Sequence, residues 1–245
     1  MKIAFISDVH GNLTSLNEAL KQIKNLNADL IYSAGDIVGY GPNPEECVKT
    51  FLEHNIRSVF GNHDYAVNHP EMDFRFNAYA KLAVQWTRER LSETSKTYLK
   101  SLPMFIEEKN FTVFHGSLDE EDPFSYILMP ADSEISFKNM KTQIGFFGHS
   151  HVAGCFIQRE SGIIDYIPGI SGCTLNLKEN EKYLINVGSV GQPRDGNPAG
   201  GFCIFDTDEK SVEIKRYQYD IDKVYDLIVE NGLPRFLGER LYSGV

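Results

Sequence analysis

Short apolar runs alternate with amphipathic segments through the first half of the chain. Mostly apolar runs at 3–6, 30–32 and 56–60 have the β-branched and aromatic residues of buried strands. Between the first two, apolar residues recur at helical spacing over 13–23, and Pro44 stands where a second helix would begin. This alternation predicts β-α-β units and a sheet that contains parallel strands.

A longer helical pattern at 76–91 interrupts the alternation, and it predicts a helical insertion at about 70–102 in a single domain that spans 1–245. A last helix is expected at 222–230, ended by Gly232. The second half is otherwise rich in strand patterns, at 111–114, 144–147, 155–158, 163–167, 183–187, 202–205 and 212–217. These elements predict an α/β fold, a four-layer α/β/β/α sandwich of two mixed sheets flanked by helices.

Composition is that of a soluble globular protein, with 42% hydrophobic and 24% charged residues in 245. The net charge, 24 − 34 = −10, argues against general nucleic-acid binding, although a local cation site could still attract a phosphate. No apolar run has the length of a membrane span or a signal peptide, so we expect a cytoplasmic protein without membrane contact. Free thiols are expected at the widely spaced Cys47, Cys155, Cys173 and Cys203.

Metal-ligand residue types directly follow five of the predicted strands. The carboxyl ends of strands in an open α/β sheet meet at one crevice, so these side chains are expected to converge. Residues two apart in extended chain project to the same face, which lets each such pair hold an ion. Carboxylate, imidazole and amide together suit Mn²⁺, Fe, Co²⁺, Ni²⁺ or Zn²⁺. The residues are Asp8 and His10, Asp36, Asn62 with His63 and Asp64, His115, and His149 and His151.

The order and spacing of these residues resemble the calcineurin-like metallophosphoesterase superfamily. The matching motifs are Asp8-x-His10, Gly35-Asp36, Gly61-Asn62-His63-Asp64, His115 and Gly148-His149-Ser150-His151. The resemblance implies two metal ions bridged by Asp36, the first held by Asp8, His10 and His151 and the second by Asn62, His115 and His149. It also implies that His63 is not a ligand and lies over the substrate.

Further motifs narrow this resemblance to a branch of the superfamily. No arginine follows Gly35-Asp36 in the run 37–41, which weakens a protein-phosphatase interpretation. The segment 186–194, with its Asn-x-Gly-Ser start, is similar to the bacterial and archaeal phosphodiesterase-like, diadenosine-tetraphosphatase-related members. We therefore expect a small phosphate ester or nucleotide as the substrate; the oligomeric state is open.

Two divalent ions and the carboxylates of Asp8 and Asp36 leave such a site with about +2 charge before a hydroxide bridges the ions. The chemistry expected is phosphodiester or nucleotide phosphate ester hydrolysis by attack of a metal-bridging hydroxide, with Mn²⁺ the first choice of metal. His63 would protonate the leaving oxygen or bind the phosphoryl group, and Asp64 would orient His63.

Three loop residues beside the expected ligands are candidates for substrate contact: Asn12, Tyr40 and Arg194. Two other functions remain open. An open metal-lined crevice also accepts a phosphomonoester, including a phosphoprotein, and Arg194 could bind the extra charge of a monoester. A non-catalytic scaffold on the same fold is less consistent with the sequence, because His63 and all seven ligand positions are present.

Overall fold

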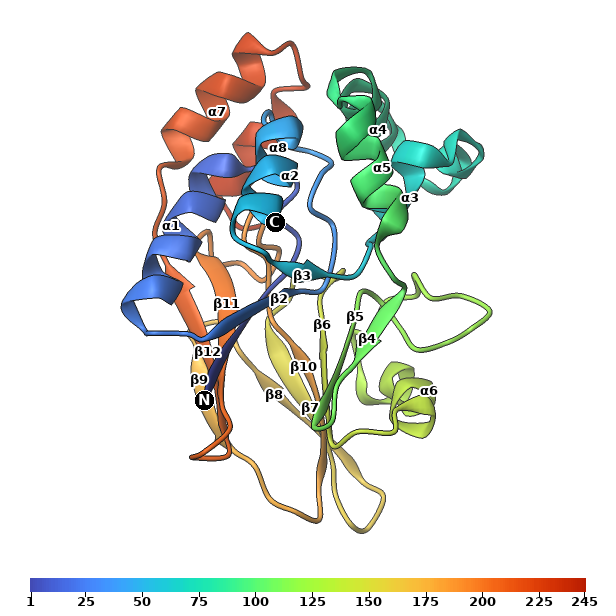
Figure 1. Cartoon of the computed structure of the whole chain (residues 1–245), viewed down its shortest axis with the longest axis vertical. Helices are drawn as coiled ribbons and strands as arrows, with labels where there is room; N and C mark the ends of the chain where they lie inside the picture. Colours follow the sequence, from blue (N-terminus) through green and yellow to red (C-terminus); the bar gives the residue numbers. More distant parts are fainter.

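Two six-stranded sheets face each other in the computed structural model, which describes residues 1–245, and helices cover their outer faces (Figure 1). The first sheet has the strand order β3-β2-β1-β11-β12-β9. Its parallel part joins β1 to β2 and β2 to β3, and β11 continues it antiparallel to β1. The bounds are β1 (Lys2–Ile6), β2 (Leu30–Ser33), β3 (Arg57–Ser58), β9 (Cys173–Asn176), β11 (Gly200–Asp206) and β12 (Ser211–Tyr217).

The second sheet has the order β4-β5-β6-β10-β7-β8 and is also mixed. Strands β5, β6 and β10 run parallel, whereas β4, β7 and β8 pair antiparallel to their neighbours. The bounds are β4 (Phe105–Glu107), β5 (Phe111–Phe114), β6 (Ile144–Phe147), β7 (Gly154–Gln158), β8 (Ile164–Pro168) and β10 (Lys182–Asn186).

Alternating side chains of the central strands build the core on both sides of each sheet. Ile3 and Phe5 of β1 lie between the sheets, where the ring of Phe5 stacks on Phe146 of β6 at 3.6 Å between centroids. The intervening Ala4 and Ile6 point the other way, to the helices on the outer face. This two-residue period is the reason that both faces of β1 are apolar.

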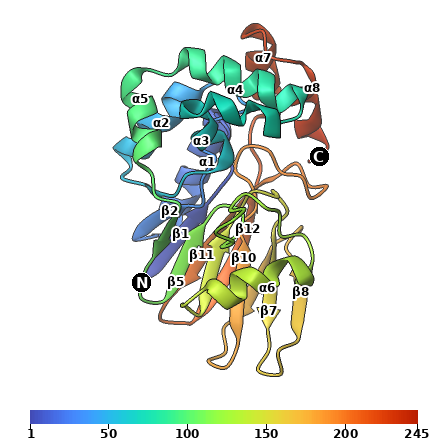
Figure 2. The same cartoon turned by 90° about the vertical axis from the view of Figure 1, so that its right-hand side faces the viewer.

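The outer layers are helical, which completes the expected four-layer sandwich. Helices α1 (Leu13–Asn25) and α2 (Pro44–Glu53) pack on the first sheet, and α6 (Pro130–Asn139) packs on the second (Figure 2). The fold class predicted from the sequence is therefore confirmed. None of the helices combines the length and apolar character that a membrane span needs.

Further helices form a cap above the carboxyl ends of the parallel strands (Figures 1 and 2). The indole Nε1 of Trp86 donates a hydrogen bond of 3.1 Å to the backbone oxygen of Asn231, and this bond ties two parts of the cap together. The elements are α3 (Asn62–Asn68), η1 (Pro70–Arg75), α4 (Ala78–Arg90), α5 (Glu93–Ser101), α7 (Ile221–Glu230), α8 (Phe236–Glu239) and η2 (Arg240–Tyr242).

Candidate metal centre and cleft

The loops that follow β1, β2, β3, β5 and β6 meet beneath the helical cap and bring the predicted ligands together. Eight non-glycine residues of the chain have a positive φ, and five of them are predicted ligands. A left-handed backbone is costly for residues with a Cβ and persists where surrounding structure enforces it, as at binding sites. The five, with φ from 50° to 65°, are Asp8, His10, Asp36, His149 and His151.

A first group of ligand atoms joins Asp8, His10 and His151, all of which are buried. The Nε2 atom of His151 lies 3.3 Å from Oδ1 of Asp8 and 3.0 Å from Nε2 of His10. A carboxylate oxygen and two imidazole nitrogens at this spacing form a donor set that fits one divalent transition-metal ion.

A second group joins Asp36, His115 and His149, with Asn62 beside it. The Oδ1 atom of Asn62 lies 3.1 Å from Nε2 of His115. The Oδ2 atom of Asp36 faces both groups, at 3.3 Å from Nε2 of His115 and 3.6 Å from Nε2 of His10. One carboxylate oxygen placed between two groups of donors is the arrangement that a bridging ligand requires.

Backbone carbonyls fix the orientation of all four predicted histidine ligands. In each ring the nitrogen that faces away from the ligand groups lies within hydrogen-bond distance of a carbonyl oxygen, at 2.5–3.2 Å. Such a contact selects the tautomer that leaves the opposite nitrogen free for a metal ion. The pairs are His10 with Val38, His115 with Ala34, His149 with Phe124 and His151 with Gln192.

Burial and neighbouring charges shift the pKa values of the predicted ligands. Burial raises the pKa of Asp8 to about 7, against the opposing charge of His115. Burial also disfavours a charged His115, but the carboxylates of Asp36 and Asp8 outweigh it and raise the pKa of His115 to about 9. Burial lowers the pKa values of His10, His149 and His151, so these rings are neutral at physiological pH, as metal ligands must be.

The imidazole of His63 differs from these ligands, although it also lies within reach of His10 and Asp36. Its Nδ1 atom is buried without a hydrogen-bond partner, so no carbonyl fixes its tautomer. The His63 ring packs edge-on against Phe76 at 4.8 Å between centroids and borders the cleft. Burial, the largest influence, lowers the pKa of His63 to about 4, against the opposing effect of Asp36.

The expected contact between Asp64 and the His63 imidazole is not formed. Instead the Asp64 carboxylate accepts hydrogen bonds from the amides of Ile37, Val38 and Gly61, at 3.0–3.2 Å. The His63 amide bonds to Oδ1 of Asp36 at 2.9 Å. Asp64 therefore positions the backbone of the two loops that carry Asp36 and His63, because a buried carboxylate satisfies three amides there at once.

The close packing of the backbone at Gly39 against the rings of His10 and His63 requires glycine at this position. Gly39 has a φ of +137°, and a Cβ atom at this residue would lie 2.6 Å from Nδ1 of His10 and 2.8 Å from Nδ1 of His63. Any larger residue would displace one of the two rings, so the loop after Asp36 needs glycine at this point.

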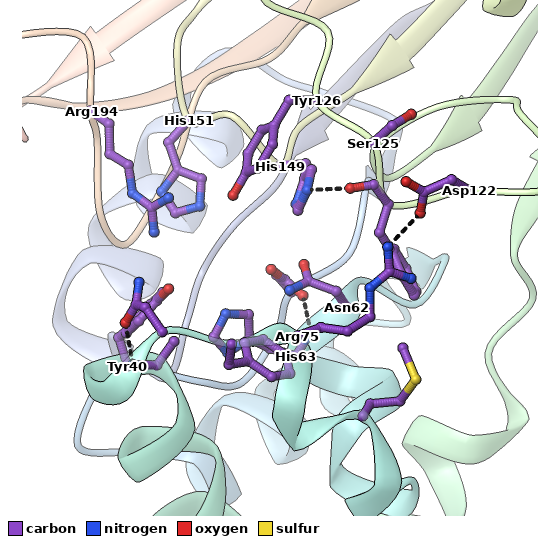
Figure 3. Close-up of a pocket in the computed structure, with 16 residues that line it drawn as sticks. Tyr40, Asn62, His63, Arg75, Asp122, Ser125, Tyr126, His149, His151 and Arg194 are labelled. Atoms are coloured by element: carbon purple, nitrogen blue, oxygen red, sulfur yellow. Dashed lines mark hydrogen bonds and ion pairs between the residues drawn. The ribbon is translucent and has the colours of Figure 1, made fainter.

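A cleft of about 460 Å³ opens over the ligand groups, between the cap and the loops of the second sheet (Figure 3). Tyr126 stacks on the ring of His149 at 4.1 Å between centroids. On the same side, Asp122 reaches across the cleft to Arg75 of the cap, at 2.8 Å (Figure 3). The volume of the cleft and its mixture of aromatic and charged wall residues are typical of a binding site for a small organic ligand.

The three candidate substrate residues have different surroundings. Tyr40 and Arg194 line the cleft, so their role in substrate contact stays a prediction. The structure corrects the expectation that Asn12 contacts substrate, because its side chain has a structural role. Its Oδ1 atom accepts a hydrogen bond from the amide of Ser15 and so caps α1, and its Nδ2 atom donates to the carbonyl of Gly191. Because both ends of the side-chain amide already have backbone partners and the residue is buried outside the cleft walls, the structure gives no support for substrate contact by Asn12.

Sequence reasoning did not identify the supporting role of the segment 186–192. The Nδ2 atom of Asn186 donates to the carbonyl of Gly148 at 2.7 Å, and Oγ of Ser189 donates to the carbonyl of Asp8 at 2.8 Å. These bonds join the loop after β1 to the loop that carries His149 and His151. The Asn-x-Gly-Ser pattern was the available signal, although it gives no indication of which backbone groups the side chains bind.

Fold and site together define a metal-dependent phosphoesterase class, and comparison with known proteins gives the family. Residues 1–210 match the calcineurin-like phosphoesterase superfamily domain, and the chain belongs to that superfamily. Its members are hydrolases that act on phosphate esters and use divalent metal ions, which the ligand groups described above could hold.

Individual proteins are similar to this chain over nearly their whole length. The chain is 41% identical over 247 residues to an uncharacterized protein of Methanocaldococcus jannaschii, covering 99% of this chain and 98% of the relative. A metallophosphoesterase from Sphaerobacter thermophilus is 37% identical, with a TM-score of 0.85 and full coverage of both chains. A hypothetical protein from Pyrococcus horikoshii shares the fold, with a TM-score of 0.79, 19% identity and coverage of 100% and 98%.

Proposed function

We propose that this protein is a dinuclear-metal phosphoesterase that prefers phosphodiesters or nucleotide phosphate esters. The observation that carries the proposal is Oδ2 of Asp36, which lies 3.3 Å from a donor atom of one ligand group and 3.6 Å from a donor atom of the other. A single carboxylate can serve two ions only when both ions lie beside it, as in two-metal phosphoesterases. The combined carboxylate, amide and imidazole donors suit several divalent transition metals, of which Mn²⁺ is the one we propose first.

Asp8, His10 and His151, and Asn62, His115 and His149, with Asp36 between them, would hold two divalent ions, which when bound would supply an activated water and neutralise phosphoryl oxygens. The chain's own residues supply the remaining functions. His63 borders the cleft beside the ligands, where its imidazole can hydrogen-bond a phosphoryl or leaving-group oxygen. In its protonated form the imidazole could donate that proton to the leaving oxygen.

The surroundings of the site support a small ester as the substrate. The cleft volume of about 460 Å³ exceeds what a bare phosphate needs, and the rings of Phe76 and Tyr126 offer apolar area for an organic group. The net charge of −10 disfavours long nucleic acids. Four free cysteines are consistent with a reducing compartment, so we propose a cytoplasmic location.

A phosphomonoesterase is the second candidate, and Arg194 is the residue that favours it. Its guanidinium lines the cleft and could bind the additional charge of a monoester dianion. Diester and monoester activities differ in the charge of the reacting group, so one pair of substrates separates them.

The test is hydrolysis of bis-p-nitrophenyl phosphate beside p-nitrophenyl phosphate, with protein stripped of metal and reloaded with Mn²⁺. We expect metal-dependent cleavage with the diester preferred, a sharp decrease in His63→Ala and wild-type rates in His54→Ala, whose imidazole is exposed. A preference for the monoester would make the protein a phosphatase. No metal-dependent cleavage of either ester would contradict the proposal and favour a non-catalytic scaffold.

A further inference from the structure

Arg194 points into the cleft from the loop after β10, beside His151 and near the ring of Tyr40 (Figure 3). Its Cζ atom lies 5.4 Å from the centroid of the Tyr40 ring. This position places a guanidinium at one end of the cleft, next to the ligand group of Asp8, His10 and His151. Its charge also contributes to the low pKa of His151, for which burial is the main cause.

The guanidinium of Arg194 has no carboxylate partner within 4.0 Å. Its hydrogen bonds from Nε and Nη2, of 3.2 and 2.7 Å, both go to the neutral Oε1 of Gln192. The adjacent carboxylate, Asp195, is fully buried and bound to Arg216 at 2.5 and 3.1 Å, so it is unavailable to Arg194. No carboxylate therefore pairs directly with the guanidinium at this end of the cleft.

Gln192 holds this guanidinium in place from a rigid position. Gln192 is 2% exposed, its amide donates to Oγ of Ser189, and its carbonyl oxygen faces Nδ1 of His151. The same residue thus orients a predicted metal ligand and Arg194. An arginine held in advance loses less conformational entropy when it binds an anion bidentately.

The opposite end of the cleft has a different charge. Arg75 is the other arginine in its wall, and Asp122 pairs with it at 2.8 Å (Figure 3). An anion near Arg75 must compete with that carboxylate, whereas an anion near Arg194 meets no competitor. The two ends therefore differ in their affinity for negative groups.

We propose that Arg194 binds a second anionic group of the substrate, so that the site selects phosphate esters whose non-reacting part is negatively charged. This inference rests on the phosphoesterase function proposed above, and it specifies which class of phosphate ester the site would prefer. A charge-assisted, bidentate hydrogen bond to a partly desolvated anion favours the charged ester by roughly tenfold to 100-fold in kcat/KM.

The test compares two chromogenic diesters that differ by one phosphate. They are the p-nitrophenyl ester of thymidine monophosphate and the same compound with a second phosphate on the other sugar hydroxyl. Wild-type protein is expected to prefer the doubly phosphorylated ester by about tenfold or more. Arg194→Gln should abolish the preference. Arg194→Lys should retain part of it, because lysine keeps the positive charge but cannot form the bidentate hydrogen bonds of a guanidinium.

Two further variants test the asymmetry of the cleft. The double variant Arg75→Ala/Asp122→Ala should leave the substrate ratio unchanged, because it removes a cation and an anion together and keeps the net charge of that end of the cleft. Arg57→Ala removes a guanidinium paired at 3.2 Å with Glu108, outside the cleft walls, and should leave both rates unchanged. Equal rates on the two esters in wild-type protein, or loss of the preference in the double variant but not in Arg194→Gln, would overturn the proposal.

A binding measurement separates this inference from the proposed activity. Calorimetry with thymidine bisphosphate and thymidine monophosphate should show tighter binding of the bisphosphate in wild-type protein and equal binding in Arg194→Gln. This result needs no turnover. If the esters are not cleaved but the difference in binding persists, the proposed phosphoesterase function fails and the anion site at Arg194 stands. If the two esters are cleaved at equal rates and the two ligands bind equally, the phosphoesterase function stands and the anion site fails.

Discussion

The Nε2 atoms of His10 and His151 face each other at 3.0 Å, while Nδ1 of each ring faces a backbone carbonyl oxygen. When both Nδ1 atoms donate their protons to those carbonyls, both Nε2 atoms present lone pairs to one another. Two lone pairs at this distance repel unless a cation lies beside them. Two imidazole nitrogens that each bind one ion at ~2.0–2.1 Å are separated by about 3 Å, so a shared metal ion accounts for the geometry.

Replacement of His151 by alanine should remove one of two metal ions. The first ion would retain Asp8, His10 and the shared Asp36, whereas the second would keep all of its ligands, Asp36, His115, His149 and Asn62. Metal analysis after dialysis should therefore give close to two equivalents of Mn²⁺ in wild-type protein and one in the variant. His54→Ala, which removes an exposed imidazole, should keep both. A His151→Ala protein with both ions would show that this ring is not a ligand.

Replacement of His63 by alanine should reduce turnover without loss of metal. A positioned acid contributes ~10²–10⁴-fold, so kcat should fall by that factor while metal content stays at the wild-type value. Because His63 lies within reach of His10 and Asp36, the metal content is the decisive readout. If the variant loses an equivalent of metal, His63 is a ligand rather than a proton donor.

The buried ion pair of Asp195 and Arg216 should stabilise the loop that carries Arg194. Their side chains are 0% and 8% exposed, and Asp195→Ala would leave the Arg216 charge uncompensated. We expect a loss of about 3–5 kcal/mol in the free energy of unfolding, measured by urea denaturation. Glu179→Ala, which breaks an exposed pair with Lys210 at 2.9 Å, should change it far less. Equal effects of the two substitutions would contradict the structural role of the Asp195 pair.

Stability should depend on the carboxyl of Glu181 below neutral pH. Hydrogen bonds from Tyr183 and Arg159 lower the pKa of Glu181 to about 2 in the folded protein. A depressed pKa stabilises the folded state above the ordinary value near 4.5, and this contribution is lost as pH falls toward 2. The urea midpoints of wild-type and Glu181→Gln protein should therefore differ at neutral pH, approach each other below the ordinary value near 4.5 and converge only at about pH 2.

Glu160→Gln is the matched control, since Glu160 is exposed and has no ion-pair partner within 4.0 Å. Its urea midpoint should stay close to that of wild-type protein at both pH values. A constant gap between wild-type and Glu181→Gln protein across this range would show that the Glu181 carboxyl does not supply the acid-sensitive stability.

The sequence predicts the layers and the convergence of ligand residues because both follow from local patterns. Each of the five loops has its ligand-type side chains directly after an apolar strand, so their meeting needs only the rule for carboxyl ends of strands. Strands β4 and β9 and helices α3, α6 and α8 were not predicted. In α6, Phe137 is the one large apolar residue that is buried, so the segment lacks a helical apolar stripe.

The supporting contacts of the site were beyond sequence reasoning for a different reason. Carbonyl groups of Ala34, Val38, Phe124 and Gln192 orient the histidines, and any residue type supplies a carbonyl. Asn12 and Asp64 were misjudged because their residue types suit both functional and structural hydrogen bonds. Only the folded chain shows that backbone groups already occupy them.

Electron paramagnetic resonance of the Mn²⁺-loaded protein is the most direct test of a dinuclear centre bridged by Asp36. Two ions that share one carboxylate are close enough for exchange coupling between their spins. We expect two equivalents of Mn²⁺ per chain and a spin-coupled spectrum that changes to that of isolated ions in Asp36→Ala. One equivalent per chain, or two uncoupled ions in wild-type protein, would contradict the proposed centre.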